Sequence, residues 1–305
     1  MLRAFFIWLS QSKSLRAIAE KSSIGRRLSS RFVAGTTVDE ALTATAAVNA
    51  LGCSVSLDPL GENVTNAEEA KRSADTAHRL LDEIATRRLN ANISVKLTQV
   101  GLDVDEGLAR SITAGLVEHS ARHNNFVRID MEGSAYTDRT LGLVRQLHSM
   151  NGNAGHVGAV IQSYLYRSEK DVEDMLQDRI RIRLCKGAYK EPPEVAFQNK
   201  EDVDANYVKL MKMLLKSGVY HGIATHDLRM IRATRNFARA EKIAPESFEF
   251  QMLYGIRRDL QQQLVKEGWR VRVYLPFGVE WYPYFMRRLA ERPANVLFVL
   301  KNLWQ

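Results

Sequence analysis

The stretch Val271-Arg-Val-Tyr-Leu-Pro-Phe-Gly-Val-Glu-Trp-Tyr-Pro-Tyr-Phe-Met-Arg-Arg-Leu-Ala-Glu291 contains a transition from a strand to a helix. Its first five residues are mainly β-branched, aromatic or aliphatic, which is typical of a short strand. Pro276 and Gly278 end that strand, and helical composition begins at Glu280. One strand followed by one helix is the repeating unit of a parallel α/β fold.

Four residues of the predicted helix recur at intervals of three and four, which places most of them on one side. They are Tyr284, Arg287, Arg288 and Glu291. Two adjacent arginines soon after a strand end form a fork suited to a carboxylate or a phosphate. The simpler interpretation is an arginine pair on a solvated face, and the rest of the chain has to decide.

Upstream of this stretch, short apolar runs fit to be buried strands alternate with helical segments. Eight strands, the last followed by a helix over 281–291, predict an α/β fold, a (β/α)8 barrel whose last helix folds over the strand C-terminal ends. An open doubly wound sheet is the alternative. In such a fold the glycine-rich loop that binds a dinucleotide follows a strand, whereas the glycine-rich segment 151–158 precedes one. The expected strands are 53–57, 93–97, 126–131, 159–163, 180–184, 222–225, 248–253 and 271–275. The expected earlier helices are 37–51, 66–87, 103–123, 137–149, 169–177, 202–217, 228–241 and 257–267.

Charge and composition divide the chain of 305 residues into two parts, a basic amphipathic N-terminal helical arm over 1–36 and a catalytic barrel over 37–305. Residues 1–33 carry seven Lys or Arg against one acid, which accounts for +6 of the net charge of +8. The nearly neutral remainder does not support nucleic-acid binding. With 45% hydrophobic and 26% charged residues, the chain can build a large core. Cys53 and Cys185 stand in apolar runs and are expected to be buried free thiols.

The N-terminal arm has three interpretations that composition leaves open. Its apolar run over 5–9 is too short to span a bilayer. The arm could pack on the barrel, lie on an anionic membrane surface, or be a mitochondrial transit peptide.

Polar residues stand at every predicted strand end, and in a parallel barrel those ends meet at the face that carries the active site. Their cations exceed what a small amino acid needs, which suits an anionic substrate plus a phosphate-bearing cofactor. These strand-end residues are Asp58, Glu62, Lys96, Asp130, Glu132, Gln162, Arg183, Lys186, Thr225, His226, Asp227, Gln251, Tyr254 and Tyr274.

Several kinds of chemistry find no support in the sequence. No metal site is expected, because His226 beside Asp227 is a poor cage. There is no Gly-x-Ser-x-Gly elbow, and neither cysteine stands near an obvious base. A bound redox cofactor is therefore the sensible carrier of the chemistry. Each polar residue also has a structural interpretation: Asp130 and Arg183, for example, could form an ion pair across the barrel mouth.

From about residue 51 to 295 the chain resembles the proline dehydrogenase family, in order and at seven strand ends. The signature Tyr-x-x-Arg-Arg-x-x-Glu of that family's last helix stands here over 284–291. The other matching segments are Ile93-Ser-Val-Lys-Leu-Thr-Gln99, Val127-Arg-Ile-Asp-Met-Glu132, Val160-Ile-Gln-Ser-Tyr164, Arg181-Ile-Arg-Leu-Cys-Lys-Gly-Ala-Tyr-Lys-Glu191, Ala224-Thr-His-Asp227 and Phe248-Glu-Phe-Gln-Met-Leu-Tyr-Gly255.

The resemblance implies oxidation of L-proline to Δ1-pyrroline-5-carboxylate, with a hydride passing from ring C5 to N5 of a flavin, FAD before FMN. It implies catalytic roles for Lys96, Asp130, Arg183 and Tyr274, and preference for proline over 4-hydroxyproline because Tyr274 crowds the ring. The implied substrate-binding residues are Lys96, Leu253, Tyr274, Tyr284, Arg287 and Arg288, with Glu62 as a gate. The implied cofactor-binding residues are Gln162, Arg183, Lys186, Gly187, Ala188, Thr225, His226, Gln251 and Glu291.

The resemblance also implies a quinone as electron acceptor and a peripheral membrane contact. The expected location is the cytoplasm or the inner face of the cytoplasmic membrane, or the mitochondrion in a eukaryote. Because the sequence ends soon after the barrel, a separate pyrroline-5-carboxylate dehydrogenase is expected to take the product. The rivals are a flavin-free barrel acting on a phosphorylated substrate and a membrane-associated or scaffold protein that has lost the chemistry.

Overall fold

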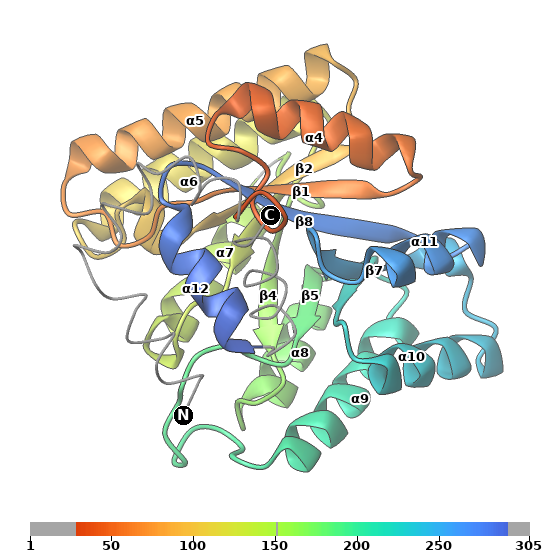
Figure 1. Cartoon of the computed structure of the whole chain (residues 1–305). Coiled ribbons are helices and arrows are strands. Elements are labelled where there is room, and N and C mark those ends of the chain that lie inside the picture. Colours follow the sequence, from red (N-terminus) through yellow and green to blue (C-terminus); the bar gives the residue numbers. More distant parts are fainter. Residues whose placement is uncertain (1–28, 151, 292–305) are drawn as a thin grey trace.

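The chain folds into a closed barrel of eight parallel strands in sequence order, surrounded by helices (Figure 1). The computed structural model describes residues 29–150 and 152–291, except the side chains of 287–291. The predicted (β/α)8 barrel is confirmed, and each predicted strand overlaps an observed one. The strands are β1 Ser54–Pro59, β2 Ala91–Lys96, β3 Val127–Asp130, β4 Val157–Gln162, β5 Arg181–Cys185, β6 His221–Ala224, β7 Phe248–Leu253 and β8 Val271–Phe277. The helices are α4 Val38–Ala50, α5 Ala67–Thr86, α6 Glu106–Arg122, α7 Thr137–Ser149, α8 Ser168–Gln177, α9 Lys200–Lys216, α10 Leu228–Ala240, α11 Arg258–Lys266 and α12 Trp281–Glu291.

Local sequence signals explain where the outer helices begin. Thr37 and Glu40 form a capping box at the start of α4, in which each side chain bonds the other's backbone N–H. The side chains of Asn66 and Asp105 accept a backbone N–H at the starts of α5 and α6. Each of these caps satisfies a backbone donor that the helix leaves unpaired.

The strands bury different side chains on their two faces. Outward residues such as Val55, Leu57 and Ile93 are fully buried in the hydrophobic core beneath the helices. The inward residues are largely polar or charged, whereas barrel interiors are more often filled by Val, Ile and Leu. In this interior Arg272 Nε donates to Glu249 Oε1 over 2.7 Å.

Two glycines on the strands leave room for the inward polar side chains. A Cβ atom at Gly158 would lie 2.7 Å from Nη1 of Arg128 and 2.3 Å from a backbone oxygen. A Cβ atom at Gly222 would lie 2.3 Å from Nε2 of Gln251. These distances are shorter than van der Waals contact, so a side chain at either position would force neighbouring atoms to move.

Helix α12 lies over the C-terminal ends of the strands, as predicted. Its aromatic residues Trp281, Tyr284 and Phe285 form a buried cluster with residues that include Ile256, after β7, and with partly buried Leu253, the last residue of β7. Phe32, Val33 and Leu60 belong to the same cluster. Most of the predicted N-terminal helical arm falls on residues 1–28, outside the described residues.

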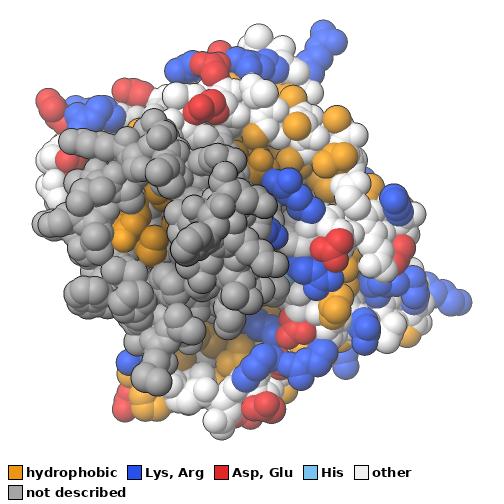
Figure 2. Space-filling view, in the orientation of Figure 1, with side chains coloured by type: hydrophobic (Ala, Val, Ile, Leu, Met, Phe, Trp, Pro, Cys, Tyr) orange, Lys and Arg blue, Asp and Glu red, His pale blue; other side chains and the backbone are white. Residues whose placement is uncertain are grey.

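The described surface mixes charges of both signs, with basic side chains beside acidic ones on the face shown in Figure 2. None of the helices in 29–150 and 152–291 combines the length and the apolar character needed to cross a bilayer.

The close approach at Gly222 predicts that Gly222→Ala destabilises the protein. The added methyl group must displace Gln251, which accepts from Arg183 and donates to Glu249, so we expect a loss of about 1–3 kcal/mol in the free energy of unfolding. Gly142→Ala is the control, because nothing lies within 4 Å of a Cβ atom there. That exposed position is in α7, where alanine should add about 0.5–1 kcal/mol of stability. Urea denaturation measures both effects, and equal stability of the two variants would contradict the prediction.

Candidate active site at the C-terminal ends of the strands

Arg183 on β5 occupies the centre of the barrel, with 6% of its surface exposed. Its guanidinium donates to Oδ1 of Asp130 over 2.5 Å, to Oε1 of Gln251, and to Oγ of Ser94 over 2.9 Å and of Ser56 over 3.2 Å. Four strands other than its own supply these acceptors. The planar donor fork of arginine therefore has a fixed position and orientation.

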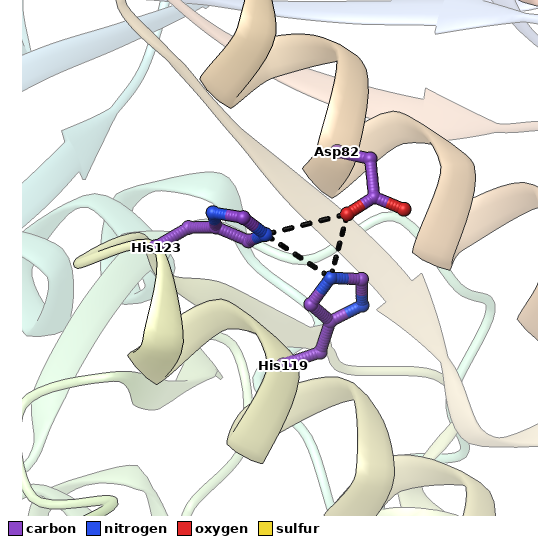
Figure 3. Close-up of side chains that lie close together, drawn as sticks. All are labelled: Asp82, His119 and His123. Carbon is purple, nitrogen blue, oxygen red and sulfur yellow. Dashed lines mark hydrogen bonds and ion pairs between the residues drawn. The ribbon is translucent and has the colours of Figure 1, made fainter.

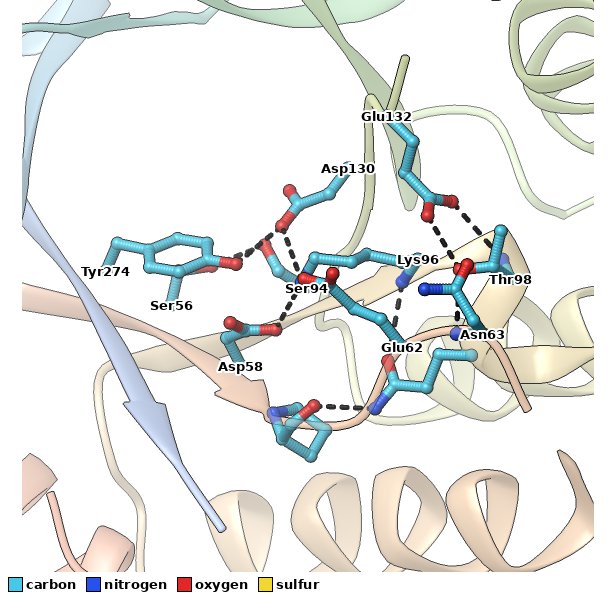
Figure 4. Close-up of polar contacts among 12 residues, drawn as sticks. Ser56, Asp58, Glu62, Asn63, Ser94, Lys96, Thr98, Asp130, Glu132 and Tyr274 are labelled. Atoms are coloured by element: carbon cyan, nitrogen blue, oxygen red, sulfur yellow. Dashed lines mark hydrogen bonds and ion pairs between the residues drawn. The ribbon is translucent and has the colours of Figure 1, made fainter. Parts of the chain in front are cut away.

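Asp130 at the end of β3 connects Arg183 to Tyr274 of β8. Its second oxygen, Oδ2, accepts from the Tyr274 hydroxyl over 2.6 Å (Figure 4). The Arg183 guanidinium carbon lies 5.0 Å from the centre of the Tyr274 ring. Burial, reinforced by the charges of Asp130 and Asp58, raises the pKa of Tyr274 well above its ordinary value. Tyr274 thus stays a protonated donor, and Asp130 serves as an acceptor on both oxygens.

Lys96 at the end of β2 is surrounded by carboxylates. Its Nζ atom lies 3.0 Å from Oδ1 of Asp58, 3.9 Å from Oδ2 of Asp130 and 4.0 Å from Oε1 of Glu62 (Figure 4). Burial lowers the pKa of Lys96, but these three carboxylates outweigh it and hold the pKa above its ordinary value. Lys96 is therefore a permanent cation.

Glu132, just beyond β3, lies next to this group. Its carboxylate accepts from the Thr98 hydroxyl over 2.6 Å and from the Thr98 backbone N–H over 3.2 Å. Burial raises the pKa of Glu132 despite these two bonds. The described ionisable groups here are thus four carboxyl groups, Asp58, Glu62, Asp130 and Glu132, and the two cations Lys96 and Arg183. Burial raises the pKa of Asp58 as it does that of Glu132, although Lys96 opposes the shift at Asp58.

The residues predicted to bind the cofactor lie at the ends of β4 to β7. Gln251 bonds Arg183, as described, and the backbone N–H of Thr225 donates to the Gln251 carbonyl over 3.1 Å. Nε2 of His226 accepts the backbone N–H of Leu253 over 2.8 Å. His226 therefore carries its proton on the other nitrogen when it is neutral.

The segment after β5 contains three more of these predicted residues. Lys186 donates to Asp204 and, over 2.8 Å, to Oδ2 of Asp227. Gly187 has a φ of +112°, and a Cβ atom there would lie 2.4 Å from the ring of Tyr164, so only glycine fits; Ala188 follows it.

Helix α12 carries the remaining predicted residues. Tyr284 is buried beside Leu253 in the aromatic cluster. Arg287, Arg288 and Glu291 lie in the last turns of the helix, and their side chains are outside the described part.

The sequence prediction did not name Ser56 or Ser94, which hold Arg183. It placed Asp58 at the active-site face but gave it no specific role, and the structure shows that Asp58 holds Lys96. One signal could have found the two serines. Ser94 stands two residues before Lys96 on β2, and Ser56 stands two residues before Asp58 on β1. Because side chains alternate along a strand, each serine lies on the same inward face as the charged residue that follows it.

Comparison with known proteins identifies the family. The family model described as proline dehydrogenase matches residues 41–301. The chain belongs to the proline dehydrogenase family. It is 41% identical to proline dehydrogenase 1 of Bacillus subtilis over 304 residues, which cover 99% of both chains. It is 40% identical to the proline dehydrogenase of Deinococcus radiodurans, over 95% of this chain and 97% of the relative.

A solved structure supports the same assignment of fold. The proline utilization A protein of Bdellovibrio bacteriovorus, inactivated by N-propargylglycine, superposes with a TM-score of 0.82 at 25% identity. The match covers 88% of this chain and 33% of that protein, so the chain spans about a third of the longer relative's length.

Proline dehydrogenases depend on a flavin, and the residues of this structure fit one. Gln162 at the end of β4 is 3% exposed, and its Oε1 atom has no hydrogen-bond partner among the described residues. A buried acceptor without a donor is costly, and the N–H of a bound isoalloxazine ring would satisfy it. Arg183 on the next strand supplies a fixed cation, and Gly187 follows that strand.

The carboxylates around Lys96 predict that a second substitution partly restores the stability lost when Lys96 is replaced. Lys96→Met should lower the free energy of unfolding by about 3–5 kcal/mol, because it leaves Asp58, 1% exposed, as an unpaired buried charge. Asp58→Asn in the same chain should restore part of that loss, since it removes the uncompensated charge. Urea denaturation of the two single variants and the double variant measures the coupling. Additive losses would contradict the pairing.

Proposed function

We propose that this member of the proline dehydrogenase family oxidises L-proline to Δ1-pyrroline-5-carboxylate, the first step of proline catabolism. The observation that carries the proposal is the buried group of Arg183, Asp130 and Tyr274 beside Lys96 at the strand C-terminal ends, in a chain whose match to the family spans 41–301.

The charges of the site suit a small zwitterion. Proline carries a ring ammonium and a carboxylate, and the four carboxyl groups around two cations leave a negative excess that favours the ammonium. In this proposal the substrate carboxylate is bound by Lys96 together with Arg287 and Arg288 of α12. Glu62 pairs with Arg287 and so acts as a gate over the bound substrate. The two arginines supply the charge that balances the site.

The remaining residues orient the substrate ring and exclude water. Asp130 fixes Tyr274, whose ring limits the space beside the substrate, and Tyr274 keeps its hydroxyl proton. Leu253 and Tyr284 add an apolar wall. Holding the substrate in one position makes the transfer effectively unimolecular.

We propose that the flavin is FAD and that, when bound, it would supply N5 as the acceptor of the hydride from ring C5. Gln162, Arg183, Lys186, Gly187, Ala188, Thr225, His226, Gln251 and Glu291 would hold it. Arg183 is the buried cation among these residues and favours negative charge on the neighbouring group. The electrons pass on to a quinone, and a separate pyrroline-5-carboxylate dehydrogenase takes the product.

The proposal predicts a visible change of absorbance in the purified protein. We expect a flavin band at about 450 nm that bleaches when L-proline is added without oxygen. A soluble quinone analogue should then restore the band. A flavin that proline leaves oxidised would overturn the substrate, and a protein that cannot be reconstituted with flavin would overturn the reaction.

Tyr274 predicts the choice between proline and 4-hydroxyproline. Tyr274→Ser opens space beside the substrate ring, so the ratio of kcat/KM for 4-hydroxyproline to that for proline should rise about tenfold. Steady-state kinetics with both substrates measures it. Tyr166→Ser, at an exposed position after β4, is the control and should leave the ratio unchanged. A ratio that moves equally in both variants would contradict the role of Tyr274.

A further inference from the structure

Three histidines and an aspartate meet on the outer layer of the barrel, between two neighbouring helices. His78 and Asp82 stand one turn apart on α5, and His119 and His123 stand one turn apart at the end of α6. Figure 3 shows one oxygen of Asp82 pointing between the rings of His119 and His123. These residues belong to the C-terminal halves of the helices, which lead into the starts of β2 and β3. The cluster is therefore on the side of the barrel opposite the active-site face.

Three atoms of this cluster have the spacing of ligands around one metal ion. Oδ1 of Asp82 lies 2.8 Å from Nε2 of His119 and 3.3 Å from Nε2 of His123, and the two nitrogens are 3.2 Å apart. In a tetrahedral zinc site with bonds of 2.0–2.1 Å, neighbouring ligand atoms lie about 3.3–3.5 Å apart. Small side-chain shifts are enough to reach that geometry.

His78 provides the outer hydrogen bond that metal-binding histidines usually have. Its Nδ1 lies 2.7 Å from Nδ1 of His119, and the two rings stack with centroids 4.9 Å apart. At this distance one ring nitrogen donates to the other, and His78 can accept through its Nδ1. A proton on Nδ1 of His119 then bonds His78 and leaves Nε2 of His119 as a lone pair facing Asp82 and His123.

Protons alone satisfy this arrangement poorly. If His119 and His123 both donate through Nε2 to the same oxygen of Asp82, their two hydrogens crowd each other across the 3.2 Å between the nitrogens. If one nitrogen instead carries no proton, its lone pair faces the carboxylate oxygen. A single cation between the three atoms removes both conflicts.

We propose that Asp82, His119 and His123 bind one divalent transition-metal ion, with His78 orienting His119 and water completing the coordination. Two imidazole nitrogens and one carboxylate oxygen suit Zn²⁺, whereas Mg²⁺ and Ca²⁺ prefer oxygen ligands alone. The ion links α5 to α6 far from the substrate. It therefore stabilises the barrel and takes no part in the oxidation.

The sequence contains one signal for this site that the prediction of no metal did not weigh. His119 and His123 stand four residues apart, the helical spacing of two ligands to one ion. Their partner Asp82 lies 37 residues before His119, and only the packing of α5 against α6 brings it close.

Calorimetric titration of the full-length, untagged protein with Zn²⁺ tests the proposal. We expect one strong site per chain and a rise in Tm on binding, both reversed by a chelator. Asp82→Asn and His123→Gln should each weaken binding at least tenfold and abolish the Tm shift. His78→Ala should weaken binding about 10- to 100-fold through the orientation of His119.

Asp75→Asn is the matched control, since Asp75 is an exposed carboxylate on the same helix outside the three ligands. It should bind Zn²⁺ like the unmodified chain. Asp82 is 59% exposed, so its substitution should leave the fold intact, which far-UV circular dichroism checks. Absence of a strong site, or a site that survives in the Asp82→Asn/His123→Gln double variant, would overturn the proposal.

Discussion

The structure depends on keeping a buried guanidinium hydrogen-bonded at the centre of the barrel. Removing the charge of Arg183 from water is unfavourable unless its donors meet acceptors in good geometry. The acceptors come from β1, β2, β3 and β7, and the ring of Tyr274 on β8 lies against the same group. The barrel must therefore be closed for the acceptors of Arg183 to come together, and the same closure positions the site. The strands that complete the sheet are the strands that satisfy Arg183.

This constraint also explains why the outward and inward faces of the strands carry different kinds of side chain. The outward faces bury aliphatic side chains against the helices and supply the hydrophobic stabilisation. The inward faces carry ion pairs such as Arg272 with Glu249, which contribute little net stability but hold side chains in single positions. Gly158 and Gly222 complete the arrangement, because a Cβ atom at these positions would collide with the inward side chains of Arg128 and Gln251.

The two ends of the barrel differ in the charged groups that they carry and in the roles that we propose for them. At the strand C-terminal ends, carboxyl groups outnumber the cations Lys96 and Arg183 among the described side chains, and in our proposal α12 and the substrate contribute further charges. Such unbalanced charge is common where binding is needed and is unfavourable for stability. At the other end, the histidine and aspartate cluster between α5 and α6 lies away from that site, where a bound ion can stabilise two neighbouring helices without changing the reaction.

The sequence by itself determined the order of strands and helices, the polar residues at the strand ends and the family. These features depend on periodicity and on short motifs, which are local properties of the chain. Only the tertiary structure decided the partners. Ser94 and Ser56 hold Arg183 from 89 and 127 residues away, Asp58 holds Lys96 more closely than Glu62 does, and Lys186 pairs with Asp204. The physical reason is that a period of two fixes which face a side chain occupies, whereas its partner is chosen by the closure of the barrel, which brings distant strands and helices together.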